Sequence, residues 1–186
     1  MEQLSDFVGF QAEWIQPKAL ERTYELRCGE AVLASLSFRS SFGTLALAET
    51  AEGQWTFKRV GFLNPRVTVR VADEEDDLAV YRPKFWGDGV LTFDDGASYA
   101  WAPTNFWHTV WAFSDSAGQL LLSLTQGREK GRLSDIFKTQ ASVEIAAPDA
   151  APDVLAVLLT LGMYLLILHQ QDAAAAVAAT GAAAAT

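Results

Sequence analysis

Hydrophobic and polar residues alternate with a period of two along most of the first 145 residues, a pattern typical of β-strands that bury one face. The segment 66–71 shows it most clearly, because its three valines would face inward while Arg66, Thr68 and Arg70 face solvent. The pattern predicts about twelve short strands. They cover residues 13–16, 23–28, 31–38, 45–50, 55–60, 66–71, 78–82, 90–93, 97–101, 107–114, 120–124 and 142–145.

Turn-forming residues separate these segments at intervals of roughly ten residues. Gly29-Glu30 divides two strongly alternating runs, and Asp94-Asp95-Gly96 is a strong hairpin signal. Short strands joined by tight turns favour an antiparallel meander that closes into a sheet or a barrel.

A different pattern follows, because the residues between Asp153 and His169 are apolar on every side apart from Thr160 and the hydroxyl of Tyr164. Pro152 and Asp153 suit the start of a helix, which we predict over 153–170. A helix that is apolar all round must be surrounded by protein or by a bilayer. Its length of roughly 25 Å, against a bilayer core of ~30 Å, leaves both options open.

The order of the elements favours a helix inside the barrel. A barrel of about twelve strands is too wide to be filled by its own side chains. The apolar helix would fill it, with a gross burial term of roughly 20–35 kcal/mol before entropy is subtracted. We therefore predict a mainly β fold, a barrel of about twelve antiparallel strands closed around a central C-terminal helix. Residues 1–171 form one domain in this prediction, and the alanine-rich tail 172–186 is frayed helix or disordered.

Charge and cysteine content limit the function. The formal net charge of −9 excludes generic nucleic-acid binding, which needs a basic face, and weakens electrostatic docking to anionic lipid. Cys28 is the single cysteine, which fits a reducing compartment, and residues 1–10 lack the pattern of a secretory signal. These features indicate a cytoplasmic protein, in solution or at a membrane.

The hairpin GVLTFDDGASYAW at 89–101, the aromatic strand at 107–113 and the hairpin at 115–124 resemble bacterial members of the tubby-like superfamily. That superfamily includes the Tubby C-terminal domain, phospholipid scramblases and LURP-one-related proteins. The resemblance covers residues 13–170 and implies a barrel around a central helix. It also implies binding of phosphoinositides or phospholipid surfaces, with membrane tethering in some members.

Two groups of basic residues are candidates for binding lipid headgroups, although neither matches the family's basic groove residue by residue. The first group surrounds one predicted hairpin and comprises Lys58, Arg59, Arg66 and Arg70. The second lies in the late loop and comprises Arg128, Lys130, Arg132 and Lys138. The late loop also contains acidic residues, so ordinary solvated surface is the competing interpretation.

Other candidate residues favour structural roles. The acidic run Asp73, Glu74, Glu75, Asp76 and Asp77 is a weak calcium candidate, because it lacks the glycine and spacing of a calcium loop and reads as a solvated loop. Cys28 is expected to be a buried, inert thiol. His108 is expected in a strand, His169 at the C-terminal end of the helix, and most tryptophans in the core.

Three functions remain open. The first is a non-enzymatic binding module that recognises a phospholipid headgroup or a protein on the outer face or rim of the barrel. The second is a β-domain anchored in a membrane through 154–168, scramblase-like or acting as a tethered regulator. The third is an enzyme with a ligand cavity between barrel wall and helix. No nucleophile-elbow, zinc-protease or phosphate-loop motif occurs, so no catalytic residue or cofactor is predicted.

Overall fold

The computed structural model describes residues 1–4, 11–18, 20–84, 87–127, 138–146 and 150–183. One helix, α1 (Pro152–Ala183), follows twelve strands. The strands are β1 (Ala12–Gln16), β2 (Thr23–Cys28), β3 (Ala31–Phe38), β4 (Ala46–Thr50), β5 (Gln54–Val60), β6 (Arg66–Val71), β7 (Ala79–Pro83), β8 (Gly89–Phe93), β9 (Ser98–Pro103), β10 (Val110–Ser114), β11 (Leu120–Thr125) and β12 (Lys138–Ile145).

The strands form one closed antiparallel barrel in which each strand pairs with its neighbours in sequence. The ring closes where β1 pairs with β12, from Ala12 opposite Val143 to Gln16 opposite Lys138. The alternation of the sequence predicted the inward faces of the strands, although Thr68, expected to face solvent, is buried. In β6, Val67 and Val69 are buried inside the barrel while Arg66 is exposed.

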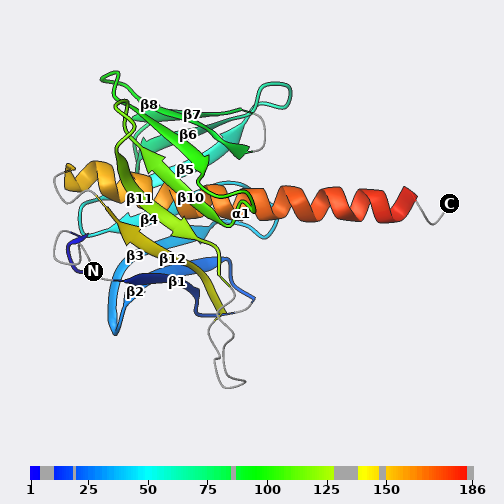
Figure 1. Ribbon diagram of the computed structural model, residues 1–186, viewed down its shortest axis with the longest axis horizontal. Coiled ribbons are helices and arrows are strands. Elements are labelled where there is room, and N and C mark those ends of the chain that lie inside the picture. The colour runs from blue at the N-terminus through cyan, green and yellow to red at the C-terminus, as the bar shows by residue number, and fades with distance from the viewer. Residues whose placement is uncertain (5–10, 19, 85–86, 128–137, 147–149, 184–186) are drawn as a thin grey trace.

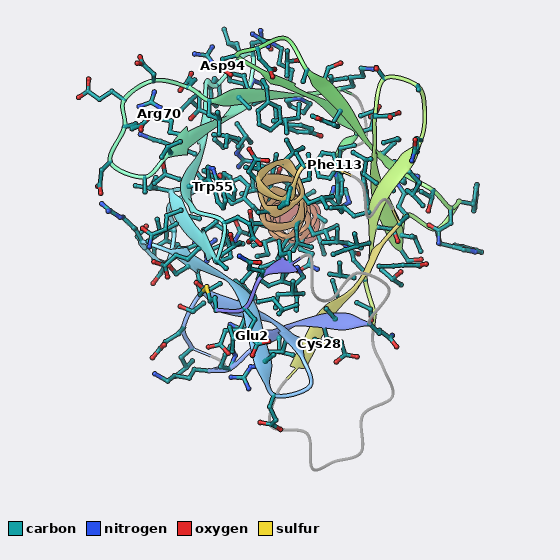
Figure 2. All side chains as sticks on the ribbon, turned by 90° about the vertical axis from the view of Figure 1, so that its left-hand side faces the viewer. Glu2, Cys28, Trp55, Arg70, Asp94 and Phe113 are labelled. Carbon is teal, nitrogen blue, oxygen red and sulfur yellow. The ribbon has the colours of Figure 1, made fainter. Side chains whose placement is uncertain are left out.

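α1 runs through the middle of the barrel, as predicted, and Figure 2 shows it end-on inside the ring of strands. Its residues from Leu155 to Leu168 are all buried. Gly162 lets the strands approach closely, because a Cβ atom there would lie 3.1 Å from Leu124 Cδ1. Both hydroxyls of this stretch donate hydrogen bonds: Thr160 Oγ1 to the carbonyl of Ala156 at 2.7 Å, and Tyr164 Oη to the carbonyl of Thr44 at 2.7 Å. The helix therefore supplies the core that the strands alone could not.

The helix is longer than the sequence predicted. It does not end at residue 170 but continues to Ala183, and the part beyond His169 projects from the barrel into solvent (Figure 1). Of the two options predicted for the tail, frayed helix or disorder, the structure has helix over the residues described. The buried half provides the helix nucleus, and alanine has the highest helix propensity, so extension costs little.

The meander places successive connections alternately at two ends of the barrel. We call the end where α1 begins the entry end; it holds the connections β2–β3, β4–β5, β6–β7, β8–β9 and β10–β11. We call the end where α1 leaves the exit end; it holds β1–β2, β3–β4, β5–β6, β7–β8 and β9–β10. In Figure 1 the entry end lies on the left and the exit end on the right.

Candidate functional site

Large hydrophobic side chains are exposed almost only at the exit end. Among the described residues, all of them except Met1 and Leu120 lie on the exit-end connections or on the projecting helix. They are Leu20, Phe42, Phe62, Leu63, Phe106, Trp107 and Val177. Single exposed apolar residues are ordinary, but a group gathered on one face usually marks an interaction surface. We refer to the first six of these side chains as the exit-end tips.

The connection between β3 and β4 holds Phe42 outward by a network centred on Arg22. Arg22 Nη1 donates to the carbonyls of Ser40, Ser41 and Gly43 at 2.9, 3.1 and 3.0 Å. Ser40 Oγ also accepts a hydrogen bond from the Gly43 amide at 2.8 Å. Phe42 is thus fully exposed on a loop whose backbone is held in place by hydrogen bonds.

The connection between β5 and β6 turns sharply at Gly61, whose φ is +85°. A Cβ atom at Gly61 would lie 2.6 Å from the carbonyl oxygen of Asn64, so only glycine fits this turn. The turn places Phe62 and Leu63 at its tip, 95% and 93% exposed. Two adjacent bulky apolar side chains are unusual at the tip of a tight turn, where polar residues are favoured.

The connection between β9 and β10 is held by the Asn105 side chain. Its Oδ1 accepts from the amides of Thr109 and Val110, and its Nδ2 donates to Thr109 Oγ1 at 2.7 Å. Phe106 and Trp107 project from this loop and meet edge to face, with ring centroids 5.3 Å apart. The predicted strand 107–114 was too long. The expectation that most tryptophans lie in the core is confirmed by Trp14, Trp55, Trp101 and Trp111, and Trp107 is an exception.

Basic residues also gather at the exit end or in the strand halves next to it. Arg59 pairs with Asp172 at 2.7 Å, and Lys18 pairs with Glu21. The other basic side chains form no ion pair with any residue that the structure describes. They are Arg22, Arg39, Lys58, Arg66, Arg82 and Lys84. Arg22 is held by the loop carbonyls and lies over the Phe38 ring, so it is not available to a ligand. The exit end thus combines apolar tips with the other five of these cations, which have no ion-pair partner among the described residues.

The entry end carries the opposite charge. Its connections contain Glu30, Glu52, the acidic run 73–77, Asp94, Asp95 and Asp115. Arg27 and Arg70 lie near this end, and each is neutralised by a carboxylate, Glu25 at 2.6 Å and Asp77 at 2.7 Å. Figure 2 looks onto this end, with Arg70 and Asp94 at the rim. The excess negative charge of the chain is therefore concentrated away from the exit end.

The structure separates the first group of predicted lipid-binding residues. Lys58, Arg59 and Arg66 lie toward the exit end, whereas Arg70 lies near the entry end and pairs with Asp77. Arg128, Lys130 and Arg132 lie outside the described residues, and Lys138 begins β12. Sequence analysis missed Arg39, Arg82 and Lys84.

The predicted calcium run is not arranged as a metal site. Asp73 has a φ of +66°, typical of a turn, and Asp77 accepts from Arg70 Nε at 2.7 Å. Within the described ranges, no three His, Cys, Asp or Glu side chains are grouped so that they could hold a metal ion. The solvated-loop interpretation accounts for the run.

Both histidines differ from their predicted positions. His108 lies in the loop before β10 with a φ of +52°, not in a strand. His169 lies inside α1, not at its end, so the expected charge interaction with a helix terminus does not arise. Both rings contact Trp111, His169 at 5.4 Å and His108 at 5.9 Å between ring centroids. Cys28 is a free thiol and only partly buried.

A cavity of about 380 Å³ opens at the exit end between the barrel wall and α1. Val67, Leu165 and Leu168 form its apolar floor, and Arg59, Lys84 and Asp172 carry charge at its mouth. Its wall includes Tyr81, whose hydroxyl donates to the Gly87 carbonyl at 2.9 Å. Burial raises the pKa of the Tyr81 phenol, and the nearby Asp88 carboxylate raises it further.

The pKa values of two other tyrosines reflect the charge at the exit end and at the entry end of the barrel. Burial raises the pKa of Tyr164 to about 12, although hydrogen bonds from the Arg59 amide and to Thr44, together with the charges of Arg59 and Arg22, oppose the rise. At the entry end, burial raises the pKa of Tyr99, and the carboxylates of Asp95, Asp115 and Asp153 raise it further. Nearby charges thus act on these two phenols in opposite directions.

α1 is long and apolar enough to span a bilayer between Pro152 and Ala179, but 78% of its most apolar window is buried inside the protein. Core helices of soluble proteins have the same property. Anchoring through residues 154–168 would require the barrel to release this helix.

Comparison of the chain with protein-family models, with curated proteins and with solved structures found no match.

Proposed function

We propose that this protein is a peripheral membrane-binding module that places its exit end on an anionic phospholipid surface. The observation that carries the proposal is the gathering of the exit-end tips on the same face as the unpaired cations. A bilayer surface matches that combination, because anionic headgroups attract lysine and arginine while apolar side chains enter the acyl boundary.

The shape of the surface supports a bilayer over a single protein groove. The tips lie on separate connections around the point where α1 leaves the barrel, and the projecting end of α1 extends from the same side (Figure 1). The surface is therefore broad, not a single groove. Each inserted side chain contributes roughly 1–2 kcal/mol when about half of it leaves water. Each nearby cation contributes ~1 kcal/mol at an anionic surface.

The net charge of −9 does not oppose this orientation. The buried part of α1 spans roughly 20 Å, which separates the acidic entry end from the proposed surface. The Debye length at physiological salt is ~8 Å, so the entry-end carboxylates are largely screened from the lipid. The same carboxylates disfavour the reversed orientation.

Flotation with liposomes tests the proposal. The full chain is mixed with vesicles of phosphatidylcholine, with or without phosphatidylserine. We expect flotation with the phosphatidylserine vesicles. The double variant Phe62→Ser/Leu63→Ser should lose at least tenfold in partitioning, and Arg66→Glu/Arg82→Glu should lose as much on anionic vesicles only.

Entry-end variants are the matched controls, because Leu120→Ser removes an exposed leucine and Asp94→Asn a charge without touching the exit end. Both should float like the parent chain. The proposal fails if the parent does not float on either composition, or if the exit-end variants float as well as the controls. In the first case a protein partner at the exit end becomes the better hypothesis.

The tubby-like resemblance implies the same ligand class, a phospholipid headgroup, but the proposal does not depend on that family assignment. It also differs from the membrane-anchor hypothesis, in which residues 154–168 leave the barrel. A peripheral protein is recovered without detergent as a soluble, folded monomer or oligomer. An anchored one stays in the membrane fraction after a high-salt wash.

A further inference from the structure

The exit-end cavity is an amphipathic site with separate apolar and charged parts. Its volume of about 380 Å³ lies within the range of small-ligand sites. Its floor consists of Val67 from β6 and Leu165 and Leu168 from α1, all at most 8% exposed. An alkyl chain would therefore meet apolar surface on both the strand side and the helix side.

The wall of the cavity is shaped by a close approach between Gly87 and α1. Gly87 has a φ of +89°, and a Cβ atom there would lie 3.0 Å from His169 Nδ1. The hydrogen bond from Tyr81 to the Gly87 carbonyl ties the same residue to β7. These contacts hold the wall without filling the space between strand and helix.

The mouth of the cavity is more cationic than anionic. Arg59 Nη1 pairs with Asp172 Oδ2 at 2.7 Å, and this pair lies near the surface with about a third of Arg59 exposed. Lys84 is exposed and forms no ion pair with the residues that the structure describes. An incoming anion can bind Lys84 and compete with Asp172 for the Arg59 guanidinium, forming charge-assisted hydrogen bonds.

We infer that this cavity binds a single-chain anionic amphiphile, with its alkyl chain on the floor and its carboxylate or phosphate head between Arg59 and Lys84. The site is distinct from the exit-end tips and needs no bilayer. The Asp172 carboxylate pairs with Arg59, so it competes with the head of the ligand and lowers the affinity for it.

Titration calorimetry with decyl phosphate, below its micelle concentration and without vesicles, tests the inference. We expect saturable binding of one molecule, at least tenfold tighter than that of decanol, and no binding of decyltrimethylammonium. Decanoate is titrated in parallel, and the tighter of the two anions assigns the site to a phosphate or to a carboxylate head. Equal affinity for all four compounds would overturn the inference, as would no binding of either anion.

Two variants at the mouth should change the affinity for decyl phosphate in opposite directions, which unspecific adsorption cannot reproduce. Asp172→Asn should tighten binding two- to tenfold because it frees Arg59, and Lys84→Glu should weaken binding at least tenfold. Both side chains are exposed, so folding is expected to be kept. Val67→Phe should fill the floor and remove binding. Unchanged affinity in Asp172→Asn and Lys84→Glu would refute the assignment even if Val67→Phe does not fold.

The loop variant Phe106→Ser/Trp107→Ser separates this inference from membrane docking. It should lose flotation on anionic vesicles while retaining decyl phosphate binding. Loss of both would show that the two sites are one and would overturn the inference of a distinct cavity site.

Discussion

The two ends of the barrel are built from the same kind of strand connection but differ in chemistry. The entry end carries carboxylates, and its basic residues are already paired, as Arg70 is with Asp77. The exit end carries apolar tips and unpaired cations, and its loops are held by internal hydrogen bonds such as those from Arg22. A closed barrel can fold without this difference in chemistry between its ends. The difference therefore indicates that one end, the exit end, is an interaction surface.

The orientation of α1 in the barrel provides a physical reason for the difference between the two ends. α1 begins at the entry end, where Asp153 lies in its first turn, next to the positive N-terminus. It leaves at the exit end, where Arg59 is joined to it by the ion pair with Asp172 and by the hydrogen bond from the Arg59 amide to Tyr164 Oη at 3.1 Å. The acidic end therefore stabilises the start of the helix, and the exit end is left free to interact.

The largest expected effect concerns the helix that both ends share. Leu161→Asp places an unpaired carboxylate in the fully buried core and should cost more than about 4 kcal/mol, enough to prevent folding. Val177→Asp, on the exposed part of the same helix, should fold normally. Circular dichroism and sizing of the soluble fraction compare the two. A folded Leu161→Asp protein that merely leaves the membrane fraction would support anchoring through 154–168.

A smaller effect is expected at alkaline pH and involves Tyr164. Burial raises its pKa to about 12, against 10 in the unfolded chain, so the folded state keeps the proton longer. Stability from this group is complete below pH ~10 and is lost as pH rises toward ~12, by roughly 2–3 kcal/mol. The free energy of unfolding, measured with urea across this pH range, should fall less steeply in Tyr164→Phe than in the parent. Part of the decrease in stability with rising pH should remain in Tyr164→Phe, because the pKa of Tyr81 is also raised.

The strands could be predicted from the sequence because one face of nearly every strand meets α1 or its neighbours, which imposes a period of two. β2, β3 and β6 have the predicted bounds. The start of β10 was placed too early because Trp107 and His108 look like strand residues, whereas Asn105 closes a loop there. The helix beyond residue 170 has no packing partner to signal it, so only propensity could have shown its extent.

The exit-end tips were missed because apolar residues in turns have no periodicity. A signal for them was nevertheless present. In a meander, alternate connections share an end, and Phe42, Phe62 and Phe106 fall in one set while the acidic run 73–77 and Asp94 fall in the other. Counting connections from the predicted strands would have separated the two ends. The cavity could not be predicted, because it depends on how Gly87 approaches His169 in space.

Two glycines compare backbone constraints at the two ends. Gly87 at the exit end and Gly96 at the entry end have similar φ values, +89° and +92°. Gly96→Ala should cost about 1 kcal/mol, from backbone conformation alone. Gly87→Ala should cost roughly 1 kcal/mol more, since its Cβ would press against His169 and Trp111. Chemical denaturation measures both, and equal costs would show that the wall of the cavity yields without strain.

The smallest expected effect tests the charge difference directly, through Tyr99. Burial is the main cause of its raised pKa, but carboxylates at the entry end add to it. Raising the ionic strength from about 0.01 M to about 1 M shortens the Debye length roughly tenfold and should lower this pKa. Asp95→Asn should lower it at low salt and remove part of the salt dependence. The titration is followed by NMR of labelled tyrosine rings. An unchanged pKa in both experiments would mean that the entry-end carboxylates exert no field over the distance of a side chain. These carboxylates could then not orient the protein at an anionic surface either.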